Sequence, residues 1–232
     1  MLLAFTALLL AAETIPTPPS ADHIMSKVEA ADRLRRESSK GHTSIRHYTI
    51  ENKRLRFKAA MKVEAITDPS GARHFRILSI QAPAAVRKLV FQRMLDTEAK
   101  AYNKSIQAGT DITRQNYIFR LENIEEENGR KRFVLAAEPR TNNSLLFRGK
   151  IWVDEATHAV VRISGSPAKN PSFWVKKTSF VHDYIGLNGQ WLASSNVSQS
   201  DIRIFGHSTV TIQYGDYAFP TPTVAAEGAG TP

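Results

Sequence analysis

Hydrophobic and polar residues alternate through most of the second half of the chain, between residues 116 and 217. In residues 117–122 (YIFRLE), every second side chain is apolar, and Phe133 and Leu135 repeat this spacing. A period of two is typical of strands that bury one face and expose the other. The pattern predicts about seven strands, over residues 116–124, 131–138, 146–154, 158–165, 172–186, 190–201 and 206–217.

Tight turns separate several of these predicted strands. Asn-Gly dipeptides begin at Asn128 and at Asn188, and this pair of residues favours two-residue hairpins because both positions need a positive φ. Residues 154–157 (DEAT) form a third short connection. The strands are therefore expected to be antiparallel neighbours in one large sheet with an apolar face.

The first half of the chain adds a helix near its start. Ser20 is a typical N-cap, and Ile24, Val28 and Leu34 recur at helical spacing. Gly41 is a natural stop signal. We predict an amphipathic helix of about five turns between these two limits.

Three strands and a second helix are expected to follow. Residues 55–64 carry apolar side chains at every odd position, and the turn at 68–71 (DPSG) leads into a strand through Phe75 and Ile77. A helix is expected over residues 83–104, because proline suits a first helical turn. This segment is apolar around more than half of its circumference, which predicts a helix wrapped by a curved sheet.

The chain is expected to form one domain, over residues 20–218. Residues 1–12 are apolar and uncharged, which is typical of the core of a secretory signal, although no basic residue precedes them. We interpret residues 1–19 as a signal peptide and linker, and residues 219–232, rich in Pro, Ala and Gly, as a disordered tail. The alternative for the first residues is a buried N-terminal helix. The protein is thus predicted to be exported, soluble in the periplasm and monomeric.

Composition narrows the chemistry further. The 232 residues include no cysteine, which excludes disulfides and thiolate chemistry. The net charge is +9, which favours anionic partners such as a membrane surface. The alternative is that Lys and Arg simply occupy the solvated face of the sheet.

Motifs for catalysis or metal binding are absent from the sequence. The seven histidines are scattered, and His182 and Asp183, as neighbours on a strand, point to opposite faces. The acidic run 125–127 is best explained as a solvated hairpin tip, opposite the basic run 130–132. We expect no catalytic residue, no metal site, no cofactor and no enzymatic activity. Nucleic-acid binding is also not expected, because no basic cluster has interleaved aromatic residues.

Aromatic residues occur on nearly all the later strands, and they could fill an ordinary core or line a pocket for an acyl chain. Residues 148–154 (RGKIWVD), the return strand 160–163 (VVRI) and the preceding Glu138-Pro139 resemble the outer-membrane lipoprotein-sorting protein family. The order of a helix, three strands, a helix and a long antiparallel meander is also similar to that family.

This resemblance implies an α+β fold, in which a large curved antiparallel sheet forms an unclosed β-barrel with two main helices on its concave side. It implies a carrier that holds acyl chains of a lipid or lipoprotein without catalysis. The alternative is an envelope sensor or regulator of the same fold that binds an acidic protein partner. The residues expected to line the apolar cavity are Phe57, Met61, Val90, Met94, Phe119, Phe133, Phe147 and Ile151.

Overall fold

The computed structural model describes residues 18–38, 41–101, 108–170, 175–203 and 206–220. The helices are α1 (Ala21–Glu37), α2 (Ala84–Val86), the π-helical turn η1 (Arg87–Phe91) and α3 (Gln92–Ala101). The strands are β1 (His42–Asn52), β2 (Phe57–Thr67), β3 (Arg73–Gln81), β4 (Tyr117–Glu127), β5 (Arg130–Pro139), β6 (Phe147–Asp154), β7 (Val160–Pro167), β8 (Val175–Leu187), β9 (Gln190–Ile202) and β10 (Gly206–Ala218). The expected signal segment 1–12 and most of the expected tail lie outside the described residues.

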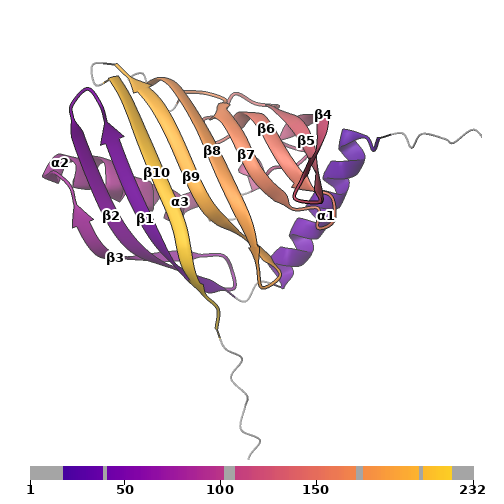
Figure 1. Ribbon diagram of the computed structural model, residues 1–232, viewed down its shortest axis with the longest axis horizontal. Coiled ribbons are helices and arrows are strands. Elements are labelled where there is room, and N and C mark those ends of the chain that lie inside the picture. The colour runs from indigo at the N-terminus through magenta and orange to yellow at the C-terminus, as the bar shows by residue number, and fades with distance from the viewer. Residues whose placement is uncertain (1–17, 39–40, 102–107, 171–174, 204–205, 221–232) are drawn as a thin grey trace, which may run out of the picture.

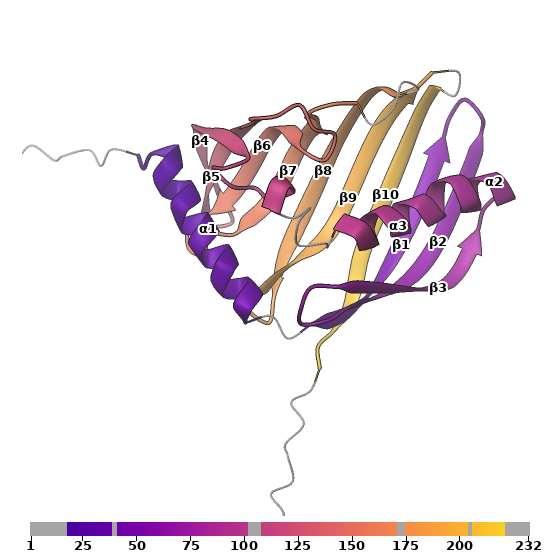
Figure 2. The same ribbon diagram turned by 180° about the vertical axis from the view of Figure 1, so that it is seen from behind.

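All ten strands form one antiparallel sheet, in the order β3-β2-β1-β10-β9-β8-β7-β6-β5-β4. Chain neighbours pair as hairpins or meanders, and the pairing of β1 with β10 joins the two halves of the chain. The sheet is curved and is not closed, since β3 and β4 are its two edges. Helices α1 and α3 lie on the same side of it, near opposite ends (Figures 1 and 2). The α+β architecture predicted from the sequence is confirmed.

Local sequence signals explain the hairpins and the buried face of the sheet. Asn128 and Asn188 have φ angles of 53° and 48°, as the predicted turns require. On β2, Met61 and Val63 are 2% and 0% exposed, whereas the intervening Lys62 lies on the other face. The period-two pattern therefore identifies the inner face of the sheet correctly.

Two separate apolar clusters form on that inner face. The first cluster is covered by α1, whose Ile24, Met25 and Val28 are at most 2% exposed. Its strand residues come from the β4 end of the sheet: Tyr117, Phe119, Phe133, Leu135, Ala137, Phe147, Ile151, Val153 and Ile163, with Phe180 and Tyr184 at its margin. The second cluster is covered by η1 and α3, through Phe91 and Leu95. Its strand residues are Tyr48, Ile50, Ala59, Met61, Val63 and Ile212, with Val210 and Tyr214 at its margin.

A pair of glycines allows a close strand contact beside the first cluster. Gly149 on β6 is paired with Gly165 on β7. A Cβ atom on Gly149 would lie 2.0 Å from the carbonyl oxygen of Ser164, and one on Gly165 would lie 2.4 Å from that of Arg148. Any side chain at these positions would force the two strands apart, so glycine is required by space rather than by φ.

Three local predictions were wrong. Leu55 is 51% exposed and lies in the turn before β2, because that strand begins only at Phe57. The segment from Ala84 to Ala101 is not wrapped by the sheet, since it buries Phe91 but leaves Leu89 54% exposed. It lies across the strands at one end of the sheet and therefore has only one covered face. The first helix ends at Glu37, earlier than the predicted stop at Gly41. In the described part of the chain, no helix is both long and apolar enough to cross a membrane.

Candidate functional site

Strand β9 crosses the middle of the inner face and contributes no residue to either apolar cluster. Three of its inward side chains, Asn196, Ser198 and Ser200, are polar, and we call them the polar seam. Register places them between apolar or aromatic neighbours: Asn196 lies opposite His182 and Ile212, and Ser198 lies opposite Phe180 and Val210. The seam therefore separates the two clusters with small hydrogen-bonding groups.

Aromatic rings from β8 and β10 meet above this seam. The rings of Tyr184 and His182 stack with centroids 4.5 Å apart and planes tilted by 9°. The rings of His182 and Tyr214 stack at 6.0 Å and 8°, although their strands are separated by β9. Neighbouring strands lie about 4.8 Å apart, so the two rings must lean toward each other over the intervening strand.

Arg46 extends the row of stacked groups toward the second cluster. Its Cζ atom lies 5.1 Å from the ring centroid of Tyr214 and 5.3 Å from that of Phe75. The residue is only 2% exposed, and one of its terminal nitrogens donates to Oε1 of Glu98 on α3 at 2.6 Å. We call Tyr184, His182, Tyr214, Arg46 and Phe75 the inner stack. It runs across the sheet from β8 to β3. Tyr214 and Phe75 pack against the second cluster, and Arg46 pairs with Glu98 of α3, so this part of the stack lies on the side that α3 covers.

A second arginine shares the Glu98 carboxylate. Arg73 at the start of β3 also donates to Oε1 of Glu98, the same oxygen that Arg46 contacts. One carboxylate on the helix thus bridges two guanidinium groups on the sheet. Such charge-assisted hydrogen bonds are stronger than neutral ones, so this bridge links α3 to β1 and β3.

Burial controls the protonation of the inner stack. Desolvation, assisted by repulsion from Arg73 and Arg46, lowers the pKa of His182 to about 4. Desolvation and then the Glu98 charge raise the pKa of Tyr214 far above its ordinary value. Burial alone would lower the pKa of Arg46, but Glu98 and the nearby Tyr48 outweigh it and raise that pKa. At neutral pH the imidazole and the phenol are therefore uncharged, and the arginine is charged.

The inner stack can bind but offers no evident set of groups for acid–base chemistry. Imidazole is the only kind of side chain in the inner stack that ordinarily titrates near pH 7. The lowered pKa of His182 keeps this imidazole neutral at that pH. Within the described residues, no group of three or more His, Cys, Asp or Glu side chains is placed to hold a metal ion. Aromatic faces, hydroxyls, an amide and a buried guanidinium suit the recognition of a ligand with both apolar and polar parts.

The structure divides the eight predicted lining residues between the two ends of the sheet. Phe119, Phe133, Phe147 and Ile151 belong to the first cluster. Met61 belongs to the second cluster, with Phe57, Val90 and Met94 packed against it. All eight contribute to the two clusters, but they do not meet around one space, because β8, β9 and β10 lie between the two groups. Their role in ligand binding stays a prediction.

Sequence reasoning missed the residues of the inner stack and the Arg46–Glu98 pair. One signal was available, since Arg46 shares its strand face with Tyr48 and Ile50. A charged side chain at a buried strand position needs a partner. The partner, Glu98, is 52 residues away on a helix, and local pattern does not identify it.

The interpretations of two charged segments are confirmed. Asp183 faces away from His182 and pairs with Arg162 at 2.5 Å on the outer face. The acidic run 125–127 ends β4 at an exposed hairpin tip, where Glu127 pairs with Arg132. Glu125 accepts a hydrogen bond from the indole nitrogen of Trp152 at 3.0 Å. These charges stabilise the surface of the sheet and do not form a reactive site.

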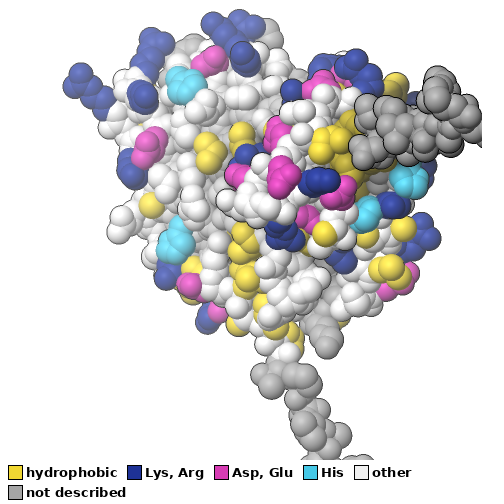
Figure 3. All heavy atoms as spheres, turned by 45° about the vertical axis from the view of Figure 1, so that its right-hand side comes forward, with side chains coloured by type: hydrophobic (Ala, Val, Ile, Leu, Met, Phe, Trp, Pro, Cys, Tyr) yellow, Lys and Arg dark blue, Asp and Glu magenta, His cyan; other side chains and the backbone are white. Residues whose placement is uncertain are grey.

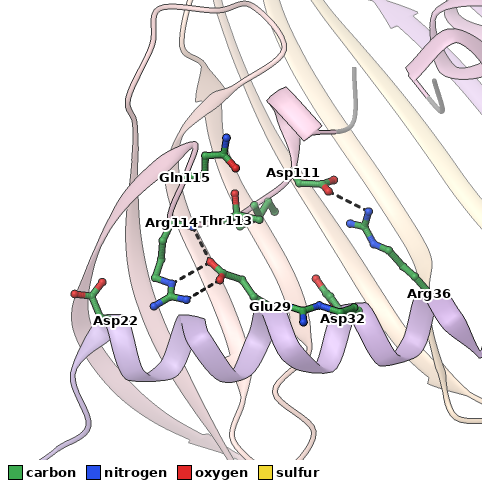
Figure 4. Close-up of a pocket in the computed structure, with 10 residues that line it drawn as sticks. Asp22, Glu29, Asp32, Arg36, Asp111, Thr113, Arg114 and Gln115 are labelled. Carbon is green, nitrogen blue, oxygen red and sulfur yellow. Dashed lines mark hydrogen bonds and ion pairs between the residues drawn. The ribbon is translucent and has the colours of Figure 1, made fainter. Parts of the chain in front are cut away.

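A polar groove of about 590 Å³ lies between α1 and residues 111–115 (Figure 4). The Arg114 guanidinium binds both carboxylate oxygens of Glu29, at 3.1 and 2.8 Å, and Arg36 pairs with Asp111 at 3.0 Å. The ion pairs of the groove neutralise one another and tie residues 111–115 to α1, so we do not regard the groove as the ligand site. On the face drawn in Figure 3, acidic and basic side chains likewise lie next to each other.

No family model and no curated protein matches the chain. Solved structures match it in architecture. A LolA superfamily protein from Nitrosomonas europaea is 8% identical, with a TM-score of 0.47 over 88% of this chain and 95% of that one. An outer membrane lipoprotein-sorting protein domain from Vibrio parahaemolyticus is 13% identical, with a TM-score of 0.47 over 86% and 94%. A chain of the Pseudomonas aeruginosa MucA/MucB complex is 13% identical, with a TM-score of 0.25 over 84% and 93%. These proteins are what the chain is similar to, and similarities at these values carry no conclusion about its family, ligand or partner.

Proposed function

We propose that this protein is a non-catalytic binding protein that holds an amphiphilic molecule, through its acyl chain, on the inner face of the sheet. The observation that carries this proposal is the organisation of that face around β9. Two helix-covered apolar clusters flank the polar seam, and the side chains of the seam and of Phe180 and Val210 beside it are partly exposed. Partly exposed aromatic groups on a concave face are typical of ligand sites.

The chemistry of the middle region favours a chain with a polar end. Phe180 and Val210 supply apolar contacts on either side of Ser198. Each methylene transferred from water to such contacts contributes about 0.8 kcal/mol to binding. The polar seam and the inner stack then provide hydrogen-bonding partners for a head group. A purely hydrocarbon ligand would exclude water from these groups without offering them a hydrogen bond, which is unfavourable.

The proposal places this activity in the periplasm, where an exported carrier would receive a lipid or the acyl chains of a lipoprotein. The apolar segment 1–12 supports export, since it has the composition of a signal core. The sensor or regulator of the same fold is the competing function. A protein partner recovered in fixed stoichiometry, together with no lipid, would favour that second function.

Ligand capture can be tested on the purified mature protein. Native mass spectrometry of protein recovered from membrane-containing cells should show a bound lipid-sized mass. A neutral amphiphile, 1-monolauroylglycerol, should displace an environment-sensitive fluorescent probe from the protein. Recovery of ligand-free protein together with no probe binding would refute the proposal.

Two neighbouring substitutions on β9 test the location. Ser198→Trp places an indole on the inner face, between Phe180 and Val210, and should weaken binding of 1-monolauroylglycerol at least about tenfold. Val197→Trp places the same ring on the outer face of the same strand, and should leave binding within about twofold. Equal effects of the two variants would show that the ligand does not lie over β9.

A further inference from the structure

Among the described residues, two guanidinium groups of the inner face meet at one carboxylate. Arg46 and Arg73 both contact Oε1 of Glu98, so one carboxylate serves two guanidinium groups. The charge of Glu98 raises the pKa of Tyr48, Tyr214 and His182. The charges of Arg46 and Arg73 both lower the pKa of each of these three groups. This part of the inner face therefore has an excess of positive charge.

Removing such a charge from water is unfavourable unless it is compensated. A guanidinium loses favourable hydration on burial. The Tyr214 and Phe75 rings compensate Arg46 in part through cation–π contacts. The Nε atom of Arg46 is buried and has no hydrogen-bond partner within the described residues. A further negative group near Arg46 would complete this arrangement.

We propose that the bound amphiphile carries an anionic group, a carboxylate or a phosphate, and that Arg46 together with Arg73 binds it. This inference rests on the proposed function and specifies the polar end of the same ligand. Guanidinium groups suit these anions because their planar, forked donors match two oxygens at once. The neutral His182 and Tyr214 beside Arg46 add hydrogen-bonding atoms without adding a competing charge.

The ion pair itself marks the entry side for such an anion. The Arg46 side chain is only 3% exposed, but the side chains of Arg73 and Glu98 are 21% and 22% exposed. An incoming anion would therefore approach past α3 and meet Arg73 first. It would compete with Glu98 for the two arginines, so Glu98 should weaken anion binding.

The wild-type protein provides the primary test, with ligands of one chain length. Laurate and dodecyl phosphate are compared with the neutral single-chain 1-monolauroylglycerol, and dilauroyl phosphatidylglycerol with the neutral two-chain 1,2-dilauroylglycerol, by probe displacement at pH 7.5. At least one anionic ligand should bind about tenfold or more tightly than its neutral counterpart. Preference for laurate or dodecyl phosphate identifies a free carboxylate or phosphate, and preference for phosphatidylglycerol identifies a phospholipid head group.

Substitutions then assign the preference to Arg46. Arg46→Met should bring the affinity for the preferred anion down to that of the neutral ligand, and should leave the neutral affinity within about threefold. Arg162→Met, on the outer face, is the matched control and should leave the preference intact. Glu98→Gln keeps both arginines and removes their carboxylate, so it should increase the preference. This variant gives the opposite sign and remains informative if Arg46→Met does not fold.

The outcomes separate this inference from the function on which it rests. Equal wild-type affinity for neutral and anionic ligands would overturn the inference and leave the proposed function standing. Failure of every ligand to bind would overturn both. A preference for anions that persists in Arg46→Met, or that decreases in Glu98→Gln, would also overturn the assignment to this site.

Discussion

Acidification should destabilise the protein through His182. This imidazole is stacked between Tyr184 and Tyr214, and burial is the main cause of its lowered pKa. The charges that act on it oppose one another, since Glu98 and Asp183 favour the imidazolium, whereas Arg73 and Arg46 disfavour it. Protonation in the folded state would therefore place a new positive charge beside two arginines.

The magnitude follows from the two pKa values. The unfolded chain takes up a proton near the ordinary value of 6.5, and the folded protein only near pH 4. Between these two pH values the unfolded state binds more protons than the folded state. The contribution of His182 to the free energy of unfolding is therefore present above about pH 6.5 and is lost as the pH falls toward 4. Between pH 7 and pH 5 the free energy of unfolding should fall by about 2 kcal/mol from this group alone. His42, whose pKa burial also lowers to about 4, acts in the same direction.

Urea unfolding, followed by tryptophan fluorescence at pH 7, 6 and 5, measures this loss. His182→Phe keeps an aromatic ring in the stack, removes the titration, and loses no hydrogen bond at Nε2, which has no partner within the described residues. The variant should lose about 2 kcal/mol less than wild type between pH 7 and pH 5. If His182→Phe and wild type lose stability in parallel, the reasoning about burial is refuted.

Three stability predictions use the same urea assay at pH 7. Gly149→Ala should lower the free energy of unfolding by about 3 kcal/mol or more, because its Cβ would overlap the backbone of β7. The control Gly215→Ala meets no atom within 4 Å and should lower it by about 1 kcal/mol or less. Equal losses would contradict the close approach of β6 and β7. Met25→Ala should lower the free energy of unfolding by about 2–5 kcal/mol, because this residue is 0% exposed. Leu34→Ala, at a position 66% exposed on the same helix, should change it by no more than about 0.5 kcal/mol. A larger loss for Leu34→Ala would show that α1 packs by another face. Ser20→Ala should cost about 1 kcal/mol because Oγ of Ser20 accepts a hydrogen bond from the backbone N–H of His23 in the first helical turn. An unchanged urea midpoint would show that this cap contributes nothing.

Much of the fold could be predicted because its signals are local. The inner face of β2 follows from alternation alone, since successive strand residues point to opposite sides. The two Asn-Gly hairpins follow from the left-handed conformations that these residues tolerate. Helix α1 follows from its cap and apolar spacing. The sequence predicted the extent of the second helical segment. It did not predict that one face of this segment is exposed, because burial of a helix face depends on the elements that pack against it.

The candidate site, in contrast, depends on contacts between distant parts of the chain. By itself the sequence determined which residues share a strand face and where the chain turns, because these properties repeat every two residues or lie within four. Only the tertiary structure decided that β1 pairs with β10, that α1 and α3 cover opposite ends of the sheet, and that β9 separates two cores. The pairing of β1 with β10 places Arg46 beside Tyr214, and the packing of α3 brings Glu98 to the same arginine. Such contacts are set by long-range strand order and helix packing, for which no short sequence pattern exists.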